Sequence, residues 1–505
     1  MKVLQRLGFN LIPLLSLCAI CFAAETGTSF KLADIADQFP SKGFEVEIAF
    51  WKKMFTGYRE TQVVFHDQRD LQVVYEVVEF IRGIRDDKEE AERQSKILKK
   101  KRDHFRELLL DLSRRKPRSE EENRIVNRAE ELGHKPTASL YRRLARDLRY
   151  QRGLREQFAE GISRSGRYLE AIQEIFREEG IPGELALLPH VESAFQWSAV
   201  SKAGAVGLWQ FVKGTARSYM TVNRYVDQRF DPLESTRAAA RLLRDNYESL
   251  ETWPLAITAY NYGRSGMMRA KRHHGSEMLT IARHYKSRRF GFASRNFYPE
   301  FLAAVEVVRN QLLYFRDIQP SAALEYEILV LPESYQVTVF EQVDGLDRTT
   351  LKEYNPFLTS RVWKEGVLPA GVDLRLPPTA LEAVRDALSK ARPVTSSFEM
   401  ASDGVMIYRV RRGDTVGKIA ARFGSSIGSI QRSNGLGDAN LIVPGQRLRI
   451  PGAGASTRSR RYRVRPGDTL AQIANRFQTS LRELIEANGL SNPNTIFLGQ
   501  VILIP

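Results

Sequence analysis

Cysteine is almost absent from this sequence of 505 residues: the two that it has, Cys18 and Cys21, stand close to the start of the chain. If the segment around them is removed, the remaining chain has no disulfide framework and no thiol chemistry. Long apolar runs are missing as well, since the one at residues 11–24 is too short to span a bilayer comfortably. The sequence has no ligand cluster of metal-binding type, and the pair at 273–274 is most simply polar surface, so we expect neither a metal nor a cofactor.

Positive charge is what the chain has in excess. It contains 76 Lys and Arg against 60 Asp and Glu, which gives a formal net charge of +16 and a pI of about 9.7. A basic protein is attracted to polyanions such as nucleic acid, anionic lipid or an anionic cell wall. Since the sequence carries no nucleic-acid-binding motif, we expect no nucleic-acid partner. Hydrophobic residues make up 43% of the chain, an ordinary globular composition, and the length predicts several domains.

Residues 1–24 have the layout of a secretory signal peptide. Two basic residues precede a short apolar run that ends in small residues, with cleavage expected after Ala23. This predicts export across the inner membrane, to the periplasm or to the outer membrane and cell wall. One alternative is lipid attachment at a cysteine, which would tether the protein to a membrane, although Leu17 and Ile20 stand where a small residue is expected. Another is an apolar helix that stays in the fold.

Residues 25–160 form a charged region for which the pattern predicts helices. The stretch from 82 to 155 is dense in Arg, Lys and Glu with sparse leucines, while aromatic residues and valines gather between 44 and 80. Solvated helical surface is the simplest interpretation, and a wall-binding or partner-binding arm is the alternative. From 161 to 318 apolar helical segments alternate with Gly-rich turns, which predicts a separate, mostly helical domain.

The C-terminal part of the chain contains an internal repeat. The string Y-R-V-R-R-G-D-T at 408–415 returns as Y-R-V-R-P-G-D-T at 462–469, and N-G-L, G-Q and I-P recur at the same offset. Each copy reads strand, turn, helix, helix, strand, with Asp or Thr placed to cap the first helix. The copies resemble LysM modules, which bind N-acetylglucosamine-containing glycans such as peptidoglycan. This implies LysM domains at 404–451 and 461–505 joined by a Gly/Ala/Ser-rich linker at 452–460; a structural repeat without a ligand is the alternative.

Residues 325–380 resemble a degenerate LysM module. The string P-A-G-V-D-L-R-L-P at 369–377 parallels V-P-G-Q-R-L-R-I-P of the first copy, and Asn355 followed by proline replaces the N-G turn. The Gly-Asp-Thr start is missing, which puts glycan binding there in doubt. The alternation at Tyr335–Val339 predicts a strand, and the small and polar residues at 390–404 predict a linker.

One stretch carries the chemistry: E-L-A-L-L-P-H-V-E-S-A-F at 184–195. At helical spacing Leu185 and Leu188 fall on the same face as Glu192, with a register that Pro189 makes approximate. A carboxyl group beside leucines is partly desolvated, which raises its pKa and keeps it protonated. That is the state in which a general acid protonates a glycosidic oxygen. A single Glu at a helix end is usually a surface residue, so a functional role for Glu192 depends on the motifs that follow it in the sequence.

Two polar segments follow, S-K-A-G-A-V-G-L-W-Q-F at 201–211 and A-Y-N-Y-G at 259–263. Their glycines permit close backbone approach, and their Ser, Gln, Tyr and Asn side chains can bond sugar hydroxyls and acetamides. Trp209 and Tyr260 could each stack on a sugar or belong to the core. Together, E-S-x-F, S-x-x-G-A-x-G-L-W-Q-F and A-Y-N-x-G resemble the catalytic domain of lytic transglycosylases, a goose-lysozyme-like helical fold.

This resemblance implies roles for individual residues. Glu192 matches the catalytic acid/base and Ser193 its neighbour, while Ser201 and Gln210 match contacts to the muramyl sugar or its acetamide. Tyr260 and Asn261 match a pair that lines the cleavage subsites, and Tyr298 falls where the family has a tyrosine near the catalytic carboxyl. The implied substrate-binding residues are therefore Ser193, Ser201, Gln210, Tyr260, Asn261 and Tyr298.

The resemblance also implies the reaction: cleavage of the MurNAc–GlcNAc β-1,4 bond without water, to give 1,6-anhydro-MurNAc ends. Glu192 would act as sole acid and base, and no second Asp or Glu lies between it and Asp227 in the sequence. The alternatives are a lysozyme-type muramidase and a catalytically silent wall-binding scaffold. The expected fold class is multidomain α+β, with a mostly helical N-terminal region, a lysozyme-like all-α catalytic domain and small βααβ LysM modules. The expected partner is the peptidoglycan glycan strand, and the oligomeric state stays open.

Overall fold

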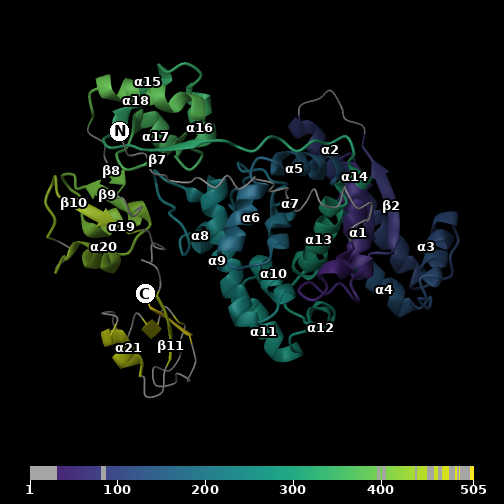
Figure 1. Ribbon diagram of the computed structural model, residues 1–505. Coiled ribbons are helices and arrows are strands. Elements are labelled where there is room, and N and C mark those ends of the chain that lie inside the picture. Colours follow the sequence, from purple (N-terminus) through teal and green to yellow (C-terminus); the bar gives the residue numbers. More distant parts are fainter. Residues whose placement is uncertain are drawn as a thin grey trace, which may run out of the picture. The chain divides into compact units, whose positions relative to one another are not determined.

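The computed structural model describes residues 31–80, 87–394, 398–400, 405–437, 441–451, 460–464, 469–476, 484–485, 488 and 501–504. The predicted signal segment and all but the last residue of the predicted 452–460 linker lie outside these residues. The described chain forms two compact units, drawn in Figure 1. The first contains the residues up to Gln196 together with Ala240–Ala323, and the second contains Trp197–Ala239 together with the residues from Leu324 onward. The boundary falls inside helix α9 (Pro232–Leu250).

Helix α13 (Phe292–Arg309) is the centre of the first unit. It packs against α1 (Glu45–Thr56), α10 (Trp253–Tyr262), α7 (Leu188–Glu192) and the 3-10 helix η3 (Gly183–Leu187). Most of its residues are buried, as expected of a helix that lies inside a core. The other described helices of this part are η2 (Leu32–Ile35), α5 (Arg155–Ser165), α6 (Leu169–Glu178), α11 (Arg264–His274), α12 (Met278–His284) and α14 (Gln311–Tyr314).

The mostly helical N-terminal region also contains a β-sheet, which the sequence pattern did not predict. Strand β1 (Gln62–Asp67) lies between β2 (Val74–Glu79) and β3 (Leu148–Arg152), and both pairings are antiparallel. β-Branched and aromatic residues favour β1 and β2. Strand β3 pairs with a strand more than eighty residues earlier, so its extended form depends on tertiary contacts.

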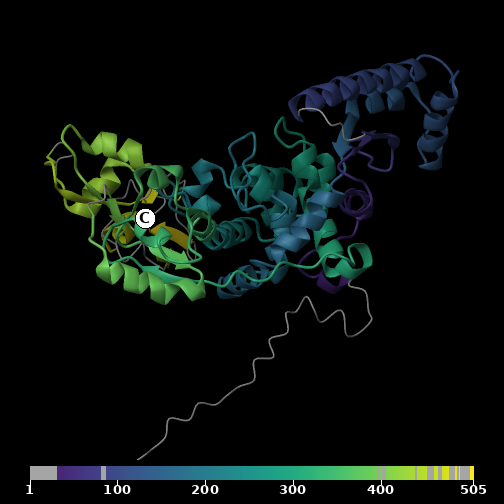
Figure 2. The ribbon, with the colours of Figure 1, turned by 90° about the horizontal axis from the view of Figure 1, so that it is seen from above.

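Three helices complete this region: α2 (Asp87–Leu112), α3 (Glu120–Glu131) and α4 (Ala138–Asp147). Helix α2, the long dark-blue helix in Figure 2, packs against α4 and β3. Buried residues of the strands and helices share one core, for example Phe65 and Phe105, whose rings lie 5.7 Å apart. The region is therefore a folded part of the first unit with a hydrophobic core of its own.

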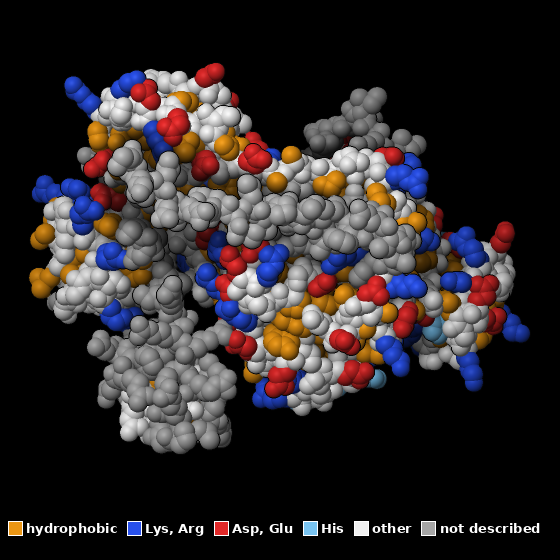
Figure 3. All heavy atoms as spheres, in the orientation of Figure 1, with side chains coloured by type: hydrophobic (Ala, Val, Ile, Leu, Met, Phe, Trp, Pro, Cys, Tyr) orange, Lys and Arg blue, Asp and Glu red, His pale blue; other side chains and the backbone are white. Residues whose placement is uncertain are grey.

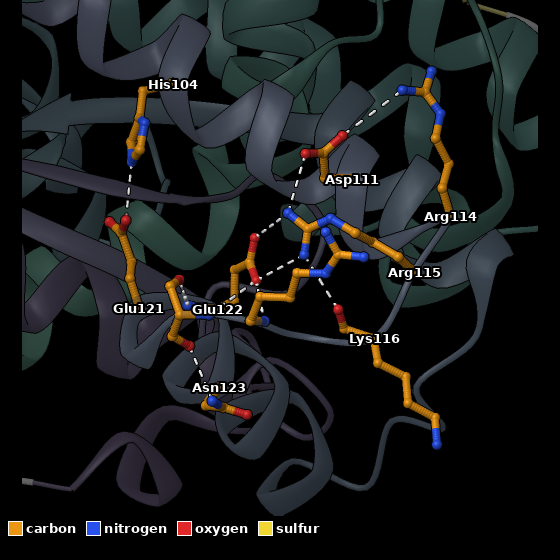
Figure 4. A network of polar contacts seen from close by, with 10 residues as sticks. His104, Asp111, Arg114, Arg115, Lys116, Glu121, Glu122 and Asn123 are labelled. Atoms are coloured by element: carbon orange, nitrogen blue, oxygen red, sulfur yellow. Dashed lines mark hydrogen bonds and ion pairs between the residues drawn. The ribbon is translucent and has the colours of Figure 1, made fainter.

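Charged side chains of this region pair with one another at the α2–α3 junction (Figure 4). Arg115 donates to both carboxylate oxygens of Glu122, at 2.7 and 3.0 Å, and Ser119 caps α3 by accepting from the Glu122 amide at 3.1 Å. The Arg115 hydrogen bond lowers the pKa of Glu122 to about 2. On the face drawn in Figure 3, Lys and Arg side chains are interspersed with Asp and Glu. Ion pairing between neighbours thus accounts for part of the charge density that the sequence displays.

In the second unit, residues 325–380, here called the third module, contain two strands, three α-helices and two further strands in that order. Strand β4 (Glu327–Val330) pairs antiparallel with β7 (Asp373–Leu376). The alternation at Tyr335–Val339 yields a strand only at β5 (Tyr335–Gln336), and a helix starts at Val337, whose side chain is buried with that of Phe340. The remaining elements are α15 (Val337–Glu341), α16 (Arg348–Tyr354), α17 (Ser360–Glu365), β6 (Val367–Leu368), η5 (Pro378–Ala380) and α18 (Leu381–Lys390).

The first LysM copy has the predicted strand–helix–helix–strand order. Thr415 caps its first helix by accepting from the Lys418 amide at 3.2 Å, as expected. The predicted linker at 390–404 is in part wrong, because 398–400 form a strand that pairs with β9. Backbone pairing with a folded strand decides this, since the sequence there is short and weakly patterned. The elements are β8 (Phe398–Met400), β9 (Met406–Arg409), α19 (Val416–Phe423), α20 (Ile427–Asn434) and β10 (Arg447–Ile450).

The described parts of the second LysM copy repeat this pairing. Strand β11 (Arg460–Arg463) lies antiparallel to β12 (Val501–Ile504), and α21 (Leu470–Arg476) follows the first strand. The side chains of Ile473 and Ala474 are buried, as the amphipathic pattern predicts.

One asparagine makes the same three hydrogen bonds in the third module and in the first LysM copy. Asn434 donates to the carbonyls of Ile430 and Arg449 and accepts from the Arg449 amide, each at 2.7 Å. Asn355 donates to the carbonyls of Leu351 and Arg375 and accepts from the Arg375 amide, at 2.8–3.0 Å. In each case the end of the second helix is bonded to the last strand. The third module thus shares this arrangement, although it lacks the Gly-Asp-Thr start.

Candidate active site

Glu192 is the last residue of α7, directly after the 3-10 helix η3. Leu185 and Leu188 are completely buried beside it, so the apolar surroundings that the sequence predicted are present. Burial raises the pKa of the Glu192 carboxyl from 4.5 to about 8. The residue as a whole keeps partial exposure. A carboxyl group in this position stays protonated at neutral pH and can donate a proton.

Two ionisable side chains from other helices lie within electrostatic reach of Glu192. Tyr260 stands on α10, and burial together with the Glu192 charge raises its pKa well above 10. Glu300 stands on α13, and the same two causes raise its pKa well above 4.5. Helices α7 and α10 both pack against α13, which is how residues distant in the sequence meet.

Glu300 was missed by the sequence reasoning, which considered only carboxylates close to Glu192 along the chain. A signal was present: Glu300 interrupts the apolar run from Phe297 to Val305, of which all the other members are buried. An acidic residue in a core helix is rare unless it is paired or functional. Burial and the charge of Glu192 both favour the neutral form of the Glu300 carboxyl.

His190 lies two residues before Glu192 and is 4% exposed. Its ring stacks on Phe158 at 5.1 Å and contacts Phe195 at 4.6 Å, and neither ring nitrogen has a hydrogen-bond partner among the described residues. Burial lowers the pKa of His190 to about 3, so the imidazole is neutral. An uncharged aromatic environment of this kind adds to the desolvation of the segment that carries Glu192.

The chain turns sharply after Glu192. Ala194 and Phe195 both have positive φ, at 48° and 55°, and the Phe195 amide donates to the Pro189 carbonyl at 3.1 Å. The Ser193 hydroxyl donates back to the same carbonyl at 3.4 Å. Two successive non-glycine residues in the left-handed region store backbone strain, which is typical of functional sites.

Asn261 and Tyr298, the other predicted residues of the first unit, differ in exposure. Asn261 is exposed at the end of α10, and its Oδ1 accepts from Ser294 at 2.9 Å. Tyr298 is fully buried, donates from its hydroxyl to the Pro40 carbonyl at 3.0 Å and packs edge-on against Phe44. The structure thus uses Tyr298 to join α13 to the N-terminal segment. The tyrosine that lies within electrostatic reach of the Glu192 carboxyl is Tyr260.

Ser201 and Gln210 belong to the second unit, in a loop at 199–211 that we call the Ser/Gln loop. Ser201 accepts from the Ala205 amide at 3.0 Å, and Gln210, at φ 46°, donates to the Gly207 carbonyl at 2.9 Å. Both residues are partly buried. Trp209 is fully buried and donates to the Thr236 hydroxyl at 2.8 Å, so it is a core residue and not a sugar platform.

Comparison with known proteins defines the class of this chain. Residues 171–279 match the family model described as the transglycosylase SLT domain, and residues 408–451 and 462–505 match the LysM domain. The chain therefore contains an SLT transglycosylase domain followed by two LysM domains. In particular, it is a homologue of membrane-bound lytic murein transglycosylase D of Escherichia coli (strain K12). The two are 29% identical over 343 residues, which is 64% of this chain and 74% of the relative.

Two further similarities cover smaller parts. N-acetylmuramoyl-L-alanine amidase sle1 of Staphylococcus epidermidis (strain ATCC 35984) is 33% identical over 121 residues, 22% of this chain and 37% of that protein. A solved structure of an inactive mutant of the lytic transglycosylase Slt from Pseudomonas aeruginosa is 22% identical, with a TM-score of 0.23, over 30% of this chain and 25% of that one. Among the described residues, no helix is long and apolar enough to cross a membrane. Within the same residues, no group of three or more His, Cys, Asp or Glu could hold a metal ion.

Proposed function

We propose that this enzyme cleaves the β-1,4 bond between N-acetylmuramic acid and N-acetylglucosamine of peptidoglycan without water, with Glu192 as its general acid and base. The observation that carries the proposal is the desolvated Glu192 carboxyl, whose pKa of about 8 keeps it protonated at neutral pH, inside an SLT domain. A protonated carboxylic acid is what departure of a sugar oxygen requires.

The reaction proceeds in two proton transfers. Glu192 donates its proton to the glycosidic oxygen, the bond to the muramyl C1 breaks, and the substrate's own acetamide supports the positive centre. The Glu192 carboxylate then takes the proton of the muramyl 6-hydroxyl, whose oxygen bonds to C1 and closes the 1,6-anhydro ring. Glu192 ends protonated as it began, and no water is consumed.

Glu300 bears on the competing hydrolytic route. Inverting glycosidases need a second carboxylate that is ionised and acts as a base toward water, and retaining ones need it as a nucleophile. Burial and the nearby Glu192 charge both raise the pKa of Glu300. A raised pKa works against ionisation and so against either role, which supports the single-carboxylate route over a lysozyme-type muramidase.

The other predicted residues would hold the glycan. Tyr260 and Asn261 lie on the helix next to Glu192, and Ser201 and Gln210 lie in the Ser/Gln loop; all four offer hydrogen bonds to sugar hydroxyls or acetamides. Ser193 follows the acid directly. The LysM domains would bind the same polymer, which fits a location in the cell envelope after export through the signal segment at 1–24.

The test is the mass of the products from purified peptidoglycan. We expect muropeptides with anhydro ends, each lighter by one water than the hydrolysed product, and we expect Glu192→Gln to release none. Glu170→Gln, which alters an exposed carboxyl on α6, serves as the matched control and should digest like the wild type. Hydrated reducing ends would refute the proposed reaction, and digestion by Glu192→Gln would refute the acid/base assignment.

A further inference from the structure

Part of the SLT domain folds together with the C-terminal modules. Tyr225 and Val226 lie inside the stretch that matches the SLT family, yet both are buried in the same core as the third module and the first LysM copy. The Tyr225 ring lies 4.2 Å from that of Phe398 and 6.0 Å from that of Phe423. The segment at 224–231 therefore packs in one hydrophobic core with the third module and the first LysM copy.

The backbone of the third module is bonded to this segment. The Asp227 amide donates to the Phe357 carbonyl at 2.8 Å, and the Thr359 amide donates to the Tyr225 carbonyl at 3.0 Å. The Thr359 hydroxyl donates to the Arg224 carbonyl at 2.7 Å. Backbone bonds of this kind fix the position of the segment along its length.

A buried ion pair adds to these bonds at the start of α9. Arg375 of the third module donates to Asp231 Oδ2 at 2.7 Å, and their side chains are 12% and 1% exposed. The other oxygen of Asp231 accepts from the amides of Leu233 and Glu234 and so caps α9. The backbone of Arg375 is itself held at two points by Asn355. A charge-assisted bond in such a desolvated place is rigid as well as strong.

From this segment the contacts continue into the Ser/Gln loop. Asp227 binds Arg229 with both oxygens, at 2.9 and 2.7 Å. Arg229 then donates to the carbonyls of Gly204 and Phe211, each at 3.2 Å, and these two residues lie on either arm of the loop. The Arg229 carbonyl lies directly against Gly207, where a Cβ atom would stand 1.9 Å away. Arg229 thus contacts the loop at three points, Gly204, Gly207 and Phe211.

We propose that the third module is a positioning element for the substrate-binding loop of the SLT domain, with Arg375 as its principal positioning residue. Arg375 pairs with Asp231, and the backbone of Phe357 is hydrogen-bonded to the amide of Asp227. Asp227 in turn pairs with Arg229, which contacts the loop. The loop in turn presents Ser201 and Gln210. The idea rests on the proposed function, in which these two residues contact the glycan. It gives the third module a role that does not require the missing Gly-Asp-Thr start.

The experiment compares Arg375→Met with Arg375→Lys and with Arg385→Met in the full-length protein. Arg385 is a control from α18, the helix that follows the third module, and its pair with Glu382 is exposed. Two quantities are measured: KM and kcat on soluble glycan oligomers, and hydrogen exchange of the amides at 199–211. For Arg375→Met we expect KM to rise about tenfold, equivalent to about 1.4 kcal/mol of binding, with kcat changed much less and with faster exchange at 199–211. The lysine variant should recover part of the KM, and Arg385→Met should match the wild type.

If Arg375→Met does not fold, the double variant Arg375→Met/Asp231→Asn replaces it, because the asparagine removes the unpaired buried charge and keeps an oxygen for the helix cap. It should fold and still show the raised KM. Wild-type KM and wild-type exchange at 199–211 in the substituted protein would overturn the proposal. Failure of the proposed function is seen separately, as the absence of anhydro products from the wild type, and leaves the exchange measurement decisive for the positioning role.

Discussion

Raising the pH from 7 to 9 should lower kcat/KM about tenfold through ionisation of Glu192. Burial moves the pKa of this carboxyl from 4.5 to about 8. A shift of that size disfavours the charged form by roughly 5 kcal/mol. With a pKa near 8, about 90% of the free enzyme carries the proton at pH 7 and about 10% at pH 9. An ordinary glutamate would be protonated in less than about 1% of molecules at pH 7.

The assay is the initial rate of soluble muropeptide release at low substrate, which reports kcat/KM and so the ionisation of the free enzyme. Ionic strength has to be constant across the series, because a chain of net charge +16 binds an anionic wall in a salt-dependent way. A rate that stays flat to pH 9, or that already falls with a midpoint near 4.5, would refute the argument from desolvation.

Glu300→Gln serves as the comparison for that profile. If Glu300 is neutral while Glu192 ionises, an uncharged isostere leaves the alkaline midpoint where it was. If Glu300 were ionised in the wild type, its removal would lower the pKa of Glu192 and move the midpoint toward acid pH. A midpoint displaced by a full unit would therefore show that the wrong carboxyl had been assigned the neutral state.

Three further predictions concern stability. Glu192→Gln should stabilise the first unit by up to about 3 kcal/mol at pH 7, because the raised native pKa makes the wild type lose stability as pH rises from 4.5 toward 8; calorimetry that finds no gain between pH 5 and 8 would contradict this. The stability of His190→Phe relative to the wild type should increase by about 2 kcal/mol when the pH is lowered from 7 to 5. The reason is that the native pKa of His190, about 3, lies below the unfolded value of 6.5, so the wild type loses stability as the pH falls through that window. Parallel melting curves of the two proteins across pH would exclude it. Asn434→Ala removes the two hydrogen bonds that Asn434 makes with the backbone of Arg449, at a cost of about 1–3 kcal/mol, so the melting transition of the second unit should drop by several degrees, and an unchanged transition would show that the bonds contribute little.

Features that depend on near neighbours in the chain could be read from the sequence. The two LysM copies were recognised from strings that recur at one offset, and Thr415 caps its helix because a cap needs only a hydroxyl three residues before an amide. The raised pKa of Glu192 followed from Leu185 and Leu188, which lie within two helical turns of it. These are interactions across three, four or seven residues, and the local backbone geometry is enough to predict them.

Contacts between residues that are far apart in the chain could not be predicted from the sequence. Strand β3 is extended because β1 pairs with it, and the helical pattern around it gave no sign of this. Glu300 lies near Glu192 because α7 packs on α13, and Arg375 reaches Asp231 across 144 residues of chain. Tyr298 shared a short motif with the family, but the rotation of α13 turns its hydroxyl to Pro40. The sequence by itself thus determined the repeats and the enzyme class and predicted Glu192 as the acid. Packing between distant residues decided which groups surround Glu192 and which module contacts the segment that follows the Ser/Gln loop.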